Sequence, residues 1–365
     1  MKTQRKFFIS LLAILSISFS IFADDKIPSL KESLTNSFLV GTAMNPADTY
    51  SGKRCDLIKK HFSLIVAENS MKPQYVEPLR GKFNFSDTDK IIDFANNNNL
   101  QARWHTLCWH SQTPNWMFTS KNGGKASKEE AMVNLKTFIF TVMEHNKGKN
   151  IHSYDVVNEC ISDSTGNLRN GSEGSKWYEI IGPEYVDLAF TWAHQADPDA
   201  FLVINDYSLE SNPKKREAMY KLVKGMKERG VPVDGIGLQM HIDITSPSAA
   251  EIKKTIEYFS ELEVKVLVTE MDMSVYGWND KSTSIDKNKL EKALQTQAKR
   301  TKEIFNVYDD EAKKGNLTSV VFWGIDDGMS WKNNFPVRGR TDYALLFNRN
   351  FEPKPCFWAL VGENK

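Results

Sequence analysis

Short apolar segments rich in β-branched residues alternate along the chain with longer segments in which apolar residues recur at helical spacing. Eight segments have the pattern of strands, at residues 38–44, 63–68, 101–109, 153–159, 201–206, 235–241, 265–271 and 318–325. Helical patterns occur at residues 86–97, 128–145, 184–195, 214–229, 247–262, 286–314 and 353–361. The 286–314 segment is long enough to break into more than one helix. Strands that are apolar on both faces and alternate with helices are typical of a parallel sheet covered by helices.

Eight such units predict an α/β fold in which the sheet closes into a (β/α)8 TIM barrel. An open, doubly wound sheet is the alternative. No GxGxxG motif follows the first predicted strand, which weakens a dinucleotide-binding interpretation. The chain has 365 residues and no linker-like or repeated segment, so we expect one catalytic domain over residues 24–365.

The N-terminus has the layout of a secretory signal peptide. Three basic residues precede an apolar run at residues 7–22, and Ala23 stands before two acidic residues. The run is shorter than the roughly 20 residues that span a bilayer. We therefore predict a signal peptide at residues 1–23, cleavage after Ala23, a secreted or periplasmic protein, and no membrane anchor once the signal is removed.

Charge and cysteine content limit which substrates, disulfides and metal sites are expected. The 47 Lys and Arg residues nearly balance the 46 Asp and Glu residues, so a neutral substrate is expected rather than nucleic acid. Export would allow a disulfide between Cys55 and Cys356, whereas Cys108 and Cys160 are expected to be buried thiols. No Cys/His cluster has zinc spacing, and neither a metal nor a cofactor is expected.

In a barrel of this kind the active site lies at the C-terminal ends of the strands. A single carboxylate at the end of an apolar strand, such as Glu159 in "YDVVNEC", is usually paired and structural. Here, however, seven of the eight predicted strands end in polar or aromatic residues. These residues are Glu68, Asn69 and Lys72; His105, Trp109, His110 and Gln112; Asn158 and Glu159; Asn205, Asp206 and Tyr207; Gln239 and His241; Glu270 and Asp272; and Trp323 and Trp331. Convergence on this scale indicates a functional site.

The residue types indicate the chemistry. No GxSxG nucleophile motif is present, and His105 and His110 are five apart on a strand, which is unlike a metal site. Two carboxylates remain, Glu159 and Glu270. Two carboxyl groups flanking a bond are what glycoside hydrolysis requires, and tryptophan faces pack against sugar rings. Three tryptophans in helical segments are expected in the core instead: Trp177, Trp192 and Trp358.

Six segments, taken together and in this order, resemble glycoside hydrolase family 10, the retaining endo-β-1,4-xylanases: "WHTLCWHSQTPNW", "YDVVNE", "INDY", "GLQMH", "VTEMDM" and "VFWG…SW". The resemblance covers about residues 30–361. It implies a general acid/base at Glu159 and a nucleophile at Glu270 that forms a covalent glycosyl-enzyme. It also implies that xylan and xylo-oligosaccharides are the partners. Retention predicts carboxyl groups about 5–5.5 Å apart, with Glu159 kept protonated by burial and by the charge of Glu270.

The resemblance also implies supporting roles. Asn158 would bind the sugar 2-hydroxyl, Gln239 would support Glu159, and His241 with Asp272 behind it would orient Glu270. Sugar binding on the non-reducing side is implied for Glu68, Asn69, Lys72, His105, Trp109, Gln112, Trp323 and Trp331. Tyr207 matches an aromatic position on the leaving-group side.

The chain departs from the family pattern at four places. Trp104 stands where a small residue is usual, Cys160 where Ala is usual, and Asn348 where Asp is common. The Gly- and Ser-rich segment 164–176 is predicted to be a loop that shapes the leaving-group side.

Three rival functions remain open. The first is β-1,4-glucanase or cellulase activity on the same barrel, and the second is a non-catalytic carbohydrate-binding protein, which the presence of both carboxylates disfavours. A metal-dependent barrel enzyme is the third, and sensitivity to a chelator would distinguish it. A monomer is expected.

Overall fold

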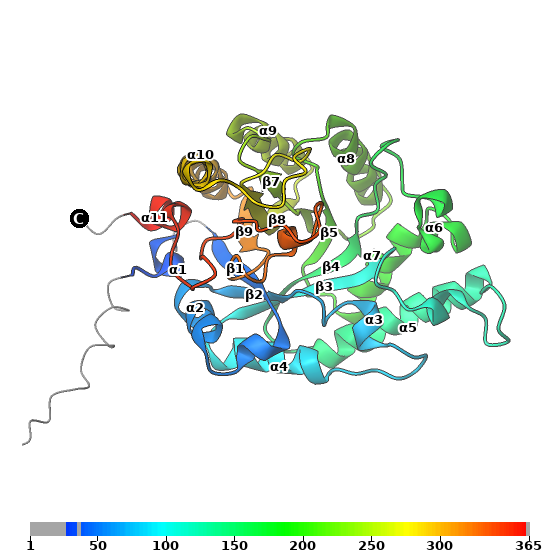
Figure 1. Ribbon diagram of the computed structural model, residues 1–365. Coiled ribbons are helices and arrows are strands. Elements are labelled where there is room, and N and C mark those ends of the chain that lie inside the picture. Colours follow the sequence, from blue (N-terminus) through cyan, green and yellow to red (C-terminus); the bar gives the residue numbers. More distant parts are fainter. Residues whose placement is uncertain (1–26, 35–37, 363–365) are drawn as a thin grey trace, which may run out of the picture.

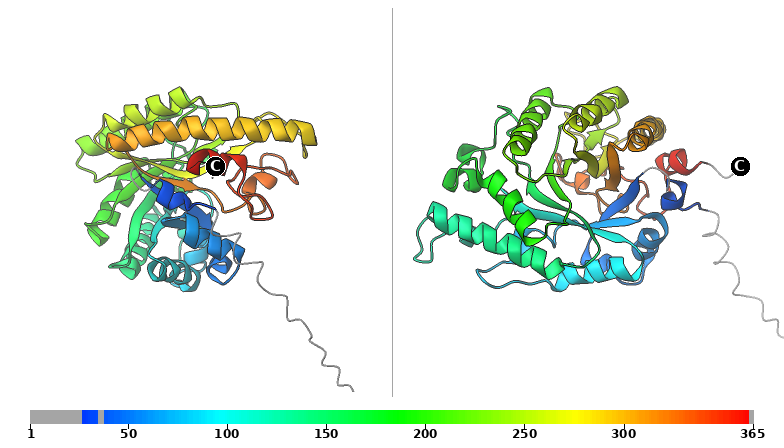
Figure 2. Two further views of the ribbon diagram at one scale, coloured as in Figure 1. Left: turned by 90° about the vertical axis from the view of Figure 1, so that its left-hand side faces the viewer. Right: turned by 180° about the vertical axis from the view of Figure 1, so that it is seen from behind.

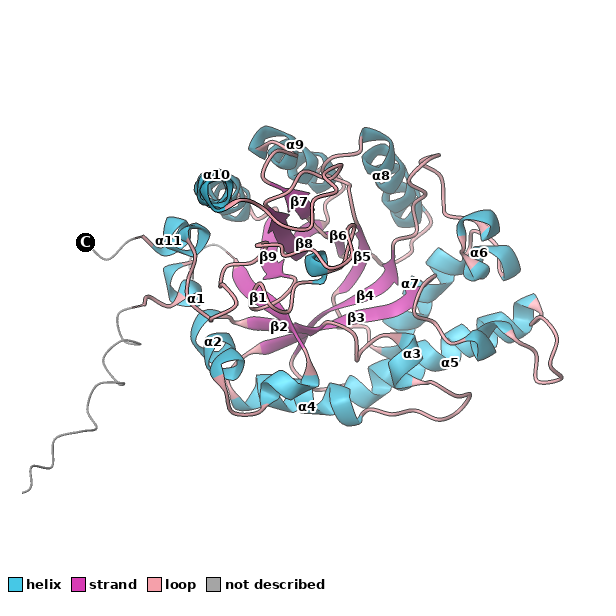
Figure 3. Cartoon of the chain, in the orientation of Figure 1, coloured by secondary structure: helices cyan, strands magenta, loops and turns pink. Residues whose placement is uncertain are grey.

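The computed structural model describes residues 27–34 and 38–362, so the predicted signal peptide lies outside the described residues. Its strands are β1 (Leu39–Met44), β2 (Leu64–Ala67), β3 (Gln101–Trp109), β4 (Ile151–Asn158), β5 (Leu202–Asp206), β6 (Gly235–Leu238), β7 (His241–Asp243), β8 (Lys265–Ser274) and β9 (Leu317–Phe322). Strands β1 to β5 each pair in parallel with the next strand along the chain, as do β7 with β8 and β8 with β9, and the pairings β6–β8 and β9–β1 close the sheet. Helices surround this ring of strands (Figures 1 and 3). The predicted single-domain (β/α)8 barrel is confirmed, and the open sheet is excluded.

All eight predicted strand segments form strands, but the sixth is interrupted. Met240 has a backbone φ of +61°, a left-handed conformation that ends the ladder of β6. The chain then continues as β7, which pairs with β8 alone, Asp272 standing opposite His241. The break therefore accounts for nine strands where the pattern indicated eight.

The helices are α1 (Leu30–Ser33), α2 (Lys53–His61), α3 (Pro73–Val76), α4 (Ser86–Asn97), α5 (Lys128–Asn146), α6 (Lys176–Ile180), α7 (Tyr185–Ala196), α8 (Pro213–Glu228), α9 (Ala249–Ser260), α10 (Lys287–Lys313) and α11 (Pro355–Val361). Short 3₁₀ turns are η1 (Pro46–Thr49), η2 (Asn115–Phe118), η3 (Gly171–Glu173) and η4 (Trp331–Asn333). Capping boxes start α5 and α9, where a serine side chain caps the helix and a glutamate three residues later bonds back.

Several helices differ from the sequence prediction, and the short helices α1, α3 and α6 are among those that were not predicted. Helix α2 was not predicted, because most of its residues are charged and only Cys55, Ile58 and His61 are buried. The idea that residues 286–314 break into several helices is wrong: α10 is a single helix that runs along the molecule in the left view of Figure 2. A buried stripe along its length, from Ala293 to Glu311, holds it against the barrel.

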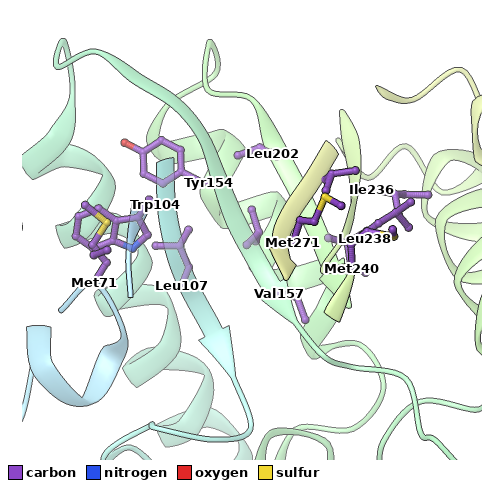
Figure 4. Packing of buried hydrophobic residues seen from close by; sticks show 14 of the residues in the cluster. Met71, Trp104, Leu107, Tyr154, Val157, Leu202, Ile236, Leu238, Met240 and Met271 are labelled. Carbon is purple, nitrogen blue, oxygen red and sulfur yellow. The ribbon is translucent and has the colours of Figure 1, made fainter. Parts of the chain in front are cut away.

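The main hydrophobic core lies between the strands and the helices. Trp104 is fully buried in this layer, with its ring centroid 6.5 Å from that of Tyr154 and Met71 beside it (Figure 4). Trp104 therefore fills the layer outside the barrel, and the next residue, His105, lines the cleft described below. The core assignment of three helical tryptophans is confirmed for Trp177 and Trp192, and Trp358 packs against the same core.

Residues from the two ends of the described chain lie together. Helix α11 packs against α10 and lies beside α1 (Figure 1). All four cysteines are buried free thiols, so the disulfide considered for Cys55 and Cys356 is not formed. Within residues 27–34 and 38–362, no helix combines the length and the apolar character needed to cross a membrane.

Candidate active site

A cleft of about 550 Å³ opens at the C-terminal ends of the barrel strands. Most of the residues singled out from the sequence line it: Glu68, Asn69, Lys72, His105, Trp109, Gln112, Glu159, Tyr207, Gln239, His241, Glu270, Trp323 and Trp331. Asn158 and Asp272 are buried and bond directly to residues of the cleft wall. The structure thus brings together side chains from strands or strand ends all around the barrel.

Glu159 follows the last residue of β4 and has a backbone φ of +55°. One carboxyl oxygen, Oε2, accepts a hydrogen bond of 2.9 Å from Nε1 of Trp109. The other, Oε1, accepts one of 3.1 Å from Nε2 of Gln239. Burial raises the pKa of Glu159, and the negative charges of Asp206 and Glu270 raise it further, while both hydrogen bonds act in the opposite direction.

Glu270 on β8 faces the same cleft in an opposite electrostatic environment. Its Oε1 accepts a hydrogen bond of 2.8 Å from Nδ2 of Asn205, and its Oε2 lies 3.3 Å from Nε2 of His241. Nδ1 of His105 lies 3.9 Å from Oε1. Burial favours the neutral acid, but the two imidazoles and the Asn205 hydrogen bond outweigh it and lower the pKa of Glu270 to about 2. Glu270 is therefore ionised at neutral pH.

His241 connects Glu270 to a buried carboxylate. Its Nδ1 donates to Oδ2 of Asp272 over 2.8 Å, and the same oxygen accepts a bond of 2.7 Å from Nε1 of Trp331. Nζ of Lys332 lies 3.6 Å from the other oxygen of Asp272. Burial opposes the charged imidazole, but the Asp272 and Glu270 carboxylates raise the pKa of His241 to about 9. His241 is therefore protonated at neutral pH and donates to both carboxylates.

Three buried amides join the two glutamates. Nδ2 of Asn205 donates both to Glu270 and, over 2.9 Å, to Oδ1 of Asn158. Nε2 of Gln239 lies 3.3 Å from the same Asn158 oxygen. Nδ2 of Asn158 is buried and has no hydrogen-bond partner among the described residues. Sequence reasoning placed Asn205 at a strand end but assigned it no role, although a polar residue at the end of an apolar strand is itself a signal.

One side of the cleft carries a compact polar group. Nζ of Lys72 donates to Oδ1 of Asn69 over 3.0 Å and lies 5.1 Å from the ring centroid of Trp109. Nε2 of Gln112 lies 3.3 Å from the same Asn69 oxygen, and Glu68 accepts a hydrogen bond from Asn45. Burial lowers the pKa of Lys72, although nearby glutamates act against this. The group presents both donors and acceptors, as the recognition of sugar hydroxyls requires.

The other side is built around Tyr207. Its hydroxyl donates to Oδ2 of Asp163 over 2.5 Å and accepts a bond of 3.1 Å from Nη2 of Arg169. Asp163 lines the cleft, as do two exposed rim aromatics, Trp278 and Phe335, the second of which stacks on Trp331. Neither these two aromatics nor the two partners of Tyr207 were identified from the sequence. They lie in loops, where no strand or helix period marks which side chains point inward.

Three of the departures from the family pattern, Trp104, Cys160 and Asn348, lie outside the cleft lining, whereas the segment 164–176 contributes Arg169, which bonds to Tyr207. Trp104 is in the core, and Asn348 bonds to Glu352 near the C-terminal end. Cys160 is buried directly after Glu159, and burial holds the pKa of its thiol far above the ordinary value. The segment 164–176 is mostly loop, with η3 inside it and the start of α6 at its end. In the part of the chain that the structure describes, no group of three His, Cys, Asp or Glu side chains could hold a metal ion.

Comparison with known proteins identifies the family to which this chain belongs. The family model of glycosyl hydrolase family 10 matches residues 29–363. Endo-1,4-beta-xylanase B of Paenibacillus barcinonensis is 40% identical over 93% of this chain and 99% of that protein. Endo-1,4-beta-xylanase C of the same organism is 41% identical over 94% of this chain, but the chain spans only 32% of that protein.

Solved structures agree with the family match. The structure of a family 10 protein from Paenibacillus barcinonensis has a TM-score of 0.89 and 40% identity, covering 92% of this chain and 97% of that one. A mutant intracellular xylanase from Thermoanaerobacterium saccharolyticum, solved with xylotetraose, has a TM-score of 0.83 and 40% identity, covering 92% of this chain and 98% of that one. The family match over nearly the whole chain, together with a barrel that carries two glutamates in one cleft, shows that this protein is a glycoside hydrolase and belongs to glycosyl hydrolase family 10.

Proposed function

We propose that the chain is a secreted, monomeric endo-1,4-β-xylanase that cleaves internal bonds of xylan with retention of configuration. The observation that carries this proposal is the opposite tuning of two carboxyl groups in one cleft. Glu159 has a raised pKa and is suited to hold a proton, whereas Glu270 has a pKa of about 2 and is suited to attack as an anion. Xylan as the substrate is supported by the similarity to endo-1,4-beta-xylanase B of Paenibacillus barcinonensis, which this chain matches over 99% of that protein.

In the first step, Glu270 forms a bond to the anomeric carbon while the glycosidic C–O bond breaks and Glu159 gives its proton to the leaving oxygen. In the second step, Glu159 takes a proton from water, the water oxygen attacks the anomeric carbon, and the bond to Glu270 breaks. Two inversions leave the product in the β configuration. Retention requires the two carboxyl groups to lie about 5–5.5 Å apart.

The surrounding residues support these roles. Trp109 and Gln239 each hold one oxygen of Glu159, and His241 donates to Glu270. The Nδ2 of Asn158, which has no partner among residues 27–34 and 38–362, is the donor that we assign to the sugar 2-hydroxyl. We assign Tyr207 to the leaving-group side of the cleft, and to the non-reducing side Glu68, Asn69, Lys72, His105, Trp109, Gln112, Trp323 and Trp331.

The main rival is cleavage of β-1,4-glucans on the same barrel. Xylose lacks the C6 hydroxymethyl group of glucose, so a xylanase has to crowd that position. Trp331 is suited to this because Asp272 fixes its indole nitrogen and Phe335 stacks on it, with ring centroids 5.0 Å apart. A missing CH₂OH group gives only modest discrimination, about 10- to 200-fold. Both substrates therefore have to be compared directly.

The first test compares wild-type protein and Glu270→Ala on linear xylan and on a soluble cellulose derivative, with reducing ends and product anomers followed over time. Wild type should cleave xylan to short oligosaccharides that first appear as β-anomers. Glu270→Ala should lower kcat/KM by at least about 10⁴-fold, since removal of a covalent nucleophile has effects of this size. Glu228→Ala, at an exposed position of α8, is the matched control and should retain full activity.

A different experimental result would contradict each part of the proposal. Preference for the cellulose derivative would overturn the substrate assignment. First products in the α configuration would overturn retention, and full activity of Glu270→Ala would overturn the assignment of the nucleophile.

A further inference from the structure

A fully buried lysine lies next to the segment that carries Glu159. Lys215 is in the first turn of α8, and its Nζ donates to Oδ1 of Asp206 over 2.8 Å and to Oδ1 of Asp163 over 2.9 Å. The ammonium also lies 3.6 Å from the ring centroid of Tyr207. One cation thus joins the end of β5, the loop after β4 and the aromatic residue on the leaving-group side of the cleft.

The same carboxylates hold the backbone that follows Glu159. Oδ2 of Asp206 accepts a hydrogen bond of 3.0 Å from the amide of Ile161. Arg169 reinforces the segment, since its Nε donates to the carbonyl of Glu159 over 3.2 Å and its Nη2 to the carbonyl of Ile161 over 3.3 Å. Residues 159–163 belong to no helix or strand, and backbone bonds hold them in part: the Glu159 amide donates to the Asn205 carbonyl, and the Arg169 amide donates to the Cys160 carbonyl. The side-chain bonds of Asp206 and Arg169 add to this restraint.

Stability alone does not explain this network. Taking an ammonium and a carboxylate out of water is costly, and apolar residues of similar volume often serve stability equally well. Glu159 also adopts a left-handed φ of +55°, which is unfavourable for a non-glycine residue and persists only where the surroundings enforce it. The strained backbone is that of Glu159 itself, and the buried ion pair anchors the segment that follows it.

We propose that Lys215 is a positioning residue for the acid/base. Through Asp206 and Asp163 it locks residues 159–163 against β5, so that the carboxyl group of Glu159 faces the leaving oxygen. The inference rests on the acid/base role proposed for Glu159.

The network also determines which charges face Glu159. Asp206 on β5 and Glu270 on β8 present negative charge to it, and Trp109 and Gln239 present neutral donors. Lys215 pairs with Asp206 and so balances the charge that raises the pKa of Glu159 more strongly. Without Lys215, Asp206 would be left as a buried carboxylate that has lost its ion-pair partner, and the segment bonded to it would lose its anchor.

The test uses two substrates that differ in their need for an acid. A xylo-oligosaccharide has a poor leaving group that must be protonated, whereas a dinitrophenyl β-xylobioside releases a stable phenolate without protonation. Lys215→Met keeps the length of the side chain and removes its charge. We expect kcat/KM to fall about 30-fold on the oligosaccharide and by less than about 3-fold on the aryl glycoside, because general acid catalysis is worth about 10²–10⁴-fold. Equal losses on both substrates would show a merely structural role and overturn the proposal.

Two further variants keep the test decisive. Lys214→Met changes the adjacent, exposed lysine and should leave both rates unchanged. Asp163→Asn removes one carboxylate of the network at a half-exposed position, where a substitution does not endanger folding. It should lower kcat/KM on the oligosaccharide about 5-fold and leave the rate on the aryl glycoside nearly unchanged. An unchanged oligosaccharide rate in Asp163→Asn would contradict the proposal even if Lys215→Met did not fold. Absence of wild-type xylan cleavage in the same assay would instead refute the proposed function.

Discussion

At the scale of single residues, the two glutamates show how environment separates identical side chains. Both stand at or near the end of a barrel strand and line one cleft. Glu159 is surrounded by neutral donors and the charge of Asp206, whereas Glu270 lies between two imidazoles. The pattern of strand ends was sufficient to find both residues. Their opposite pKa shifts depend on partners from other strands. These partners are distant along the chain, so the sequence alone does not show that they are neighbours.

The pH dependence of the reaction should follow from this separation. We expect the acid limb of kcat/KM to follow ionisation of Glu270, because the nucleophile must be charged. The pKa of Glu270 is lowered to about 2 by the charge of His105, by His241 and by the Asn205 hydrogen bond, and replacement of His241 by Asn removes one of these contributions. That pKa should rise toward its ordinary value of about 4.3, so activity should be lost at a higher pH on the acid side. The check is the pH profile of kcat/KM, where we expect the acid limb of His241→Asn to move up by about 1–2 units.

His194→Asn serves as the control, because His194 lies on the exposed face of α7. Its acid limb should coincide with that of the wild type. An unmoved limb in His241→Asn would show that the charge on His241 does not keep Glu270 ionised.

At the scale of elements, strand geometry positions the amides of the site. Gly237 on β6 lies beside Asn205 on β5, with which it is in register. A Cβ at Gly237 would lie 2.3 Å from Oδ1 of Asn205 and 2.9 Å from a methyl group of Thr269. The missing side chain therefore gives Asn205 room to bond both Asn158 and Glu270. In the sequence, this glycine shows only as a residue that disfavours a strand, and nothing indicates its role beside Asn205.

Gly237→Ala should therefore reduce catalysis more than stability. The added methyl group forces Asn205 away from Glu270, and we expect kcat to fall at least about 10-fold, since misplacement by about 1 Å can cost 10²-fold. Steady-state kinetics on xylan and a thermal melt check this.

Gly235→Ala, two residues earlier on the same strand, is the matched control. Its Cβ would meet the ends of the Leu267 and Phe201 side chains rather than a residue of the site. It should lower the melting temperature but retain kcat. Normal kcat in Gly237→Ala would refute the spacing role assigned to Gly237.

At the scale of the whole molecule, closure of the barrel brings the site together. Glu159 and Glu270 come from β4 and β8, which are not neighbours in the sheet, and Trp331 comes from η4 beyond β9. Closure places all three on the wall of one cleft. The near balance of charge over the whole chain agrees with a neutral polysaccharide, because it provides no long-range attraction for a polyanion.

Export is the prediction that concerns the chain as a whole. Expression of the full sequence in a bacterial host should yield a mature protein that begins at Asp24, because signal peptidases cut after small residues such as Ala23. Mass spectrometry of the periplasmic and medium fractions measures the N-terminus. A variant without residues 2–23 should stay inside the cell. An exported protein that still begins at Met1 would contradict cleavage.

The alternation of apolar and helical segments by itself determined the class of fold, the eight strand segments and the strand ends that carry the site. These features are visible in short stretches of sequence. A strand that is buried on both faces is a continuous apolar segment, and the polar residues of the site follow directly after it. The break at Met240, the unbroken length of α10 and the presence of α2 depended on packing against other elements. A local pattern underdetermines such contacts.

Only the tertiary structure decided how the site is tuned. The pairing of Asp206 with Lys215, the placement of Asn205 between Asn158 and Glu270, and the rim formed by Trp278 and Phe335 join segments that are distant along the chain. Electrostatic and hydrogen-bond energies depend on distances in space, and these arise only when the barrel closes. The sequence thus determined which residues are present at the strand ends, and the fold decided which of them hold a proton, which hold a charge, and what keeps each in place.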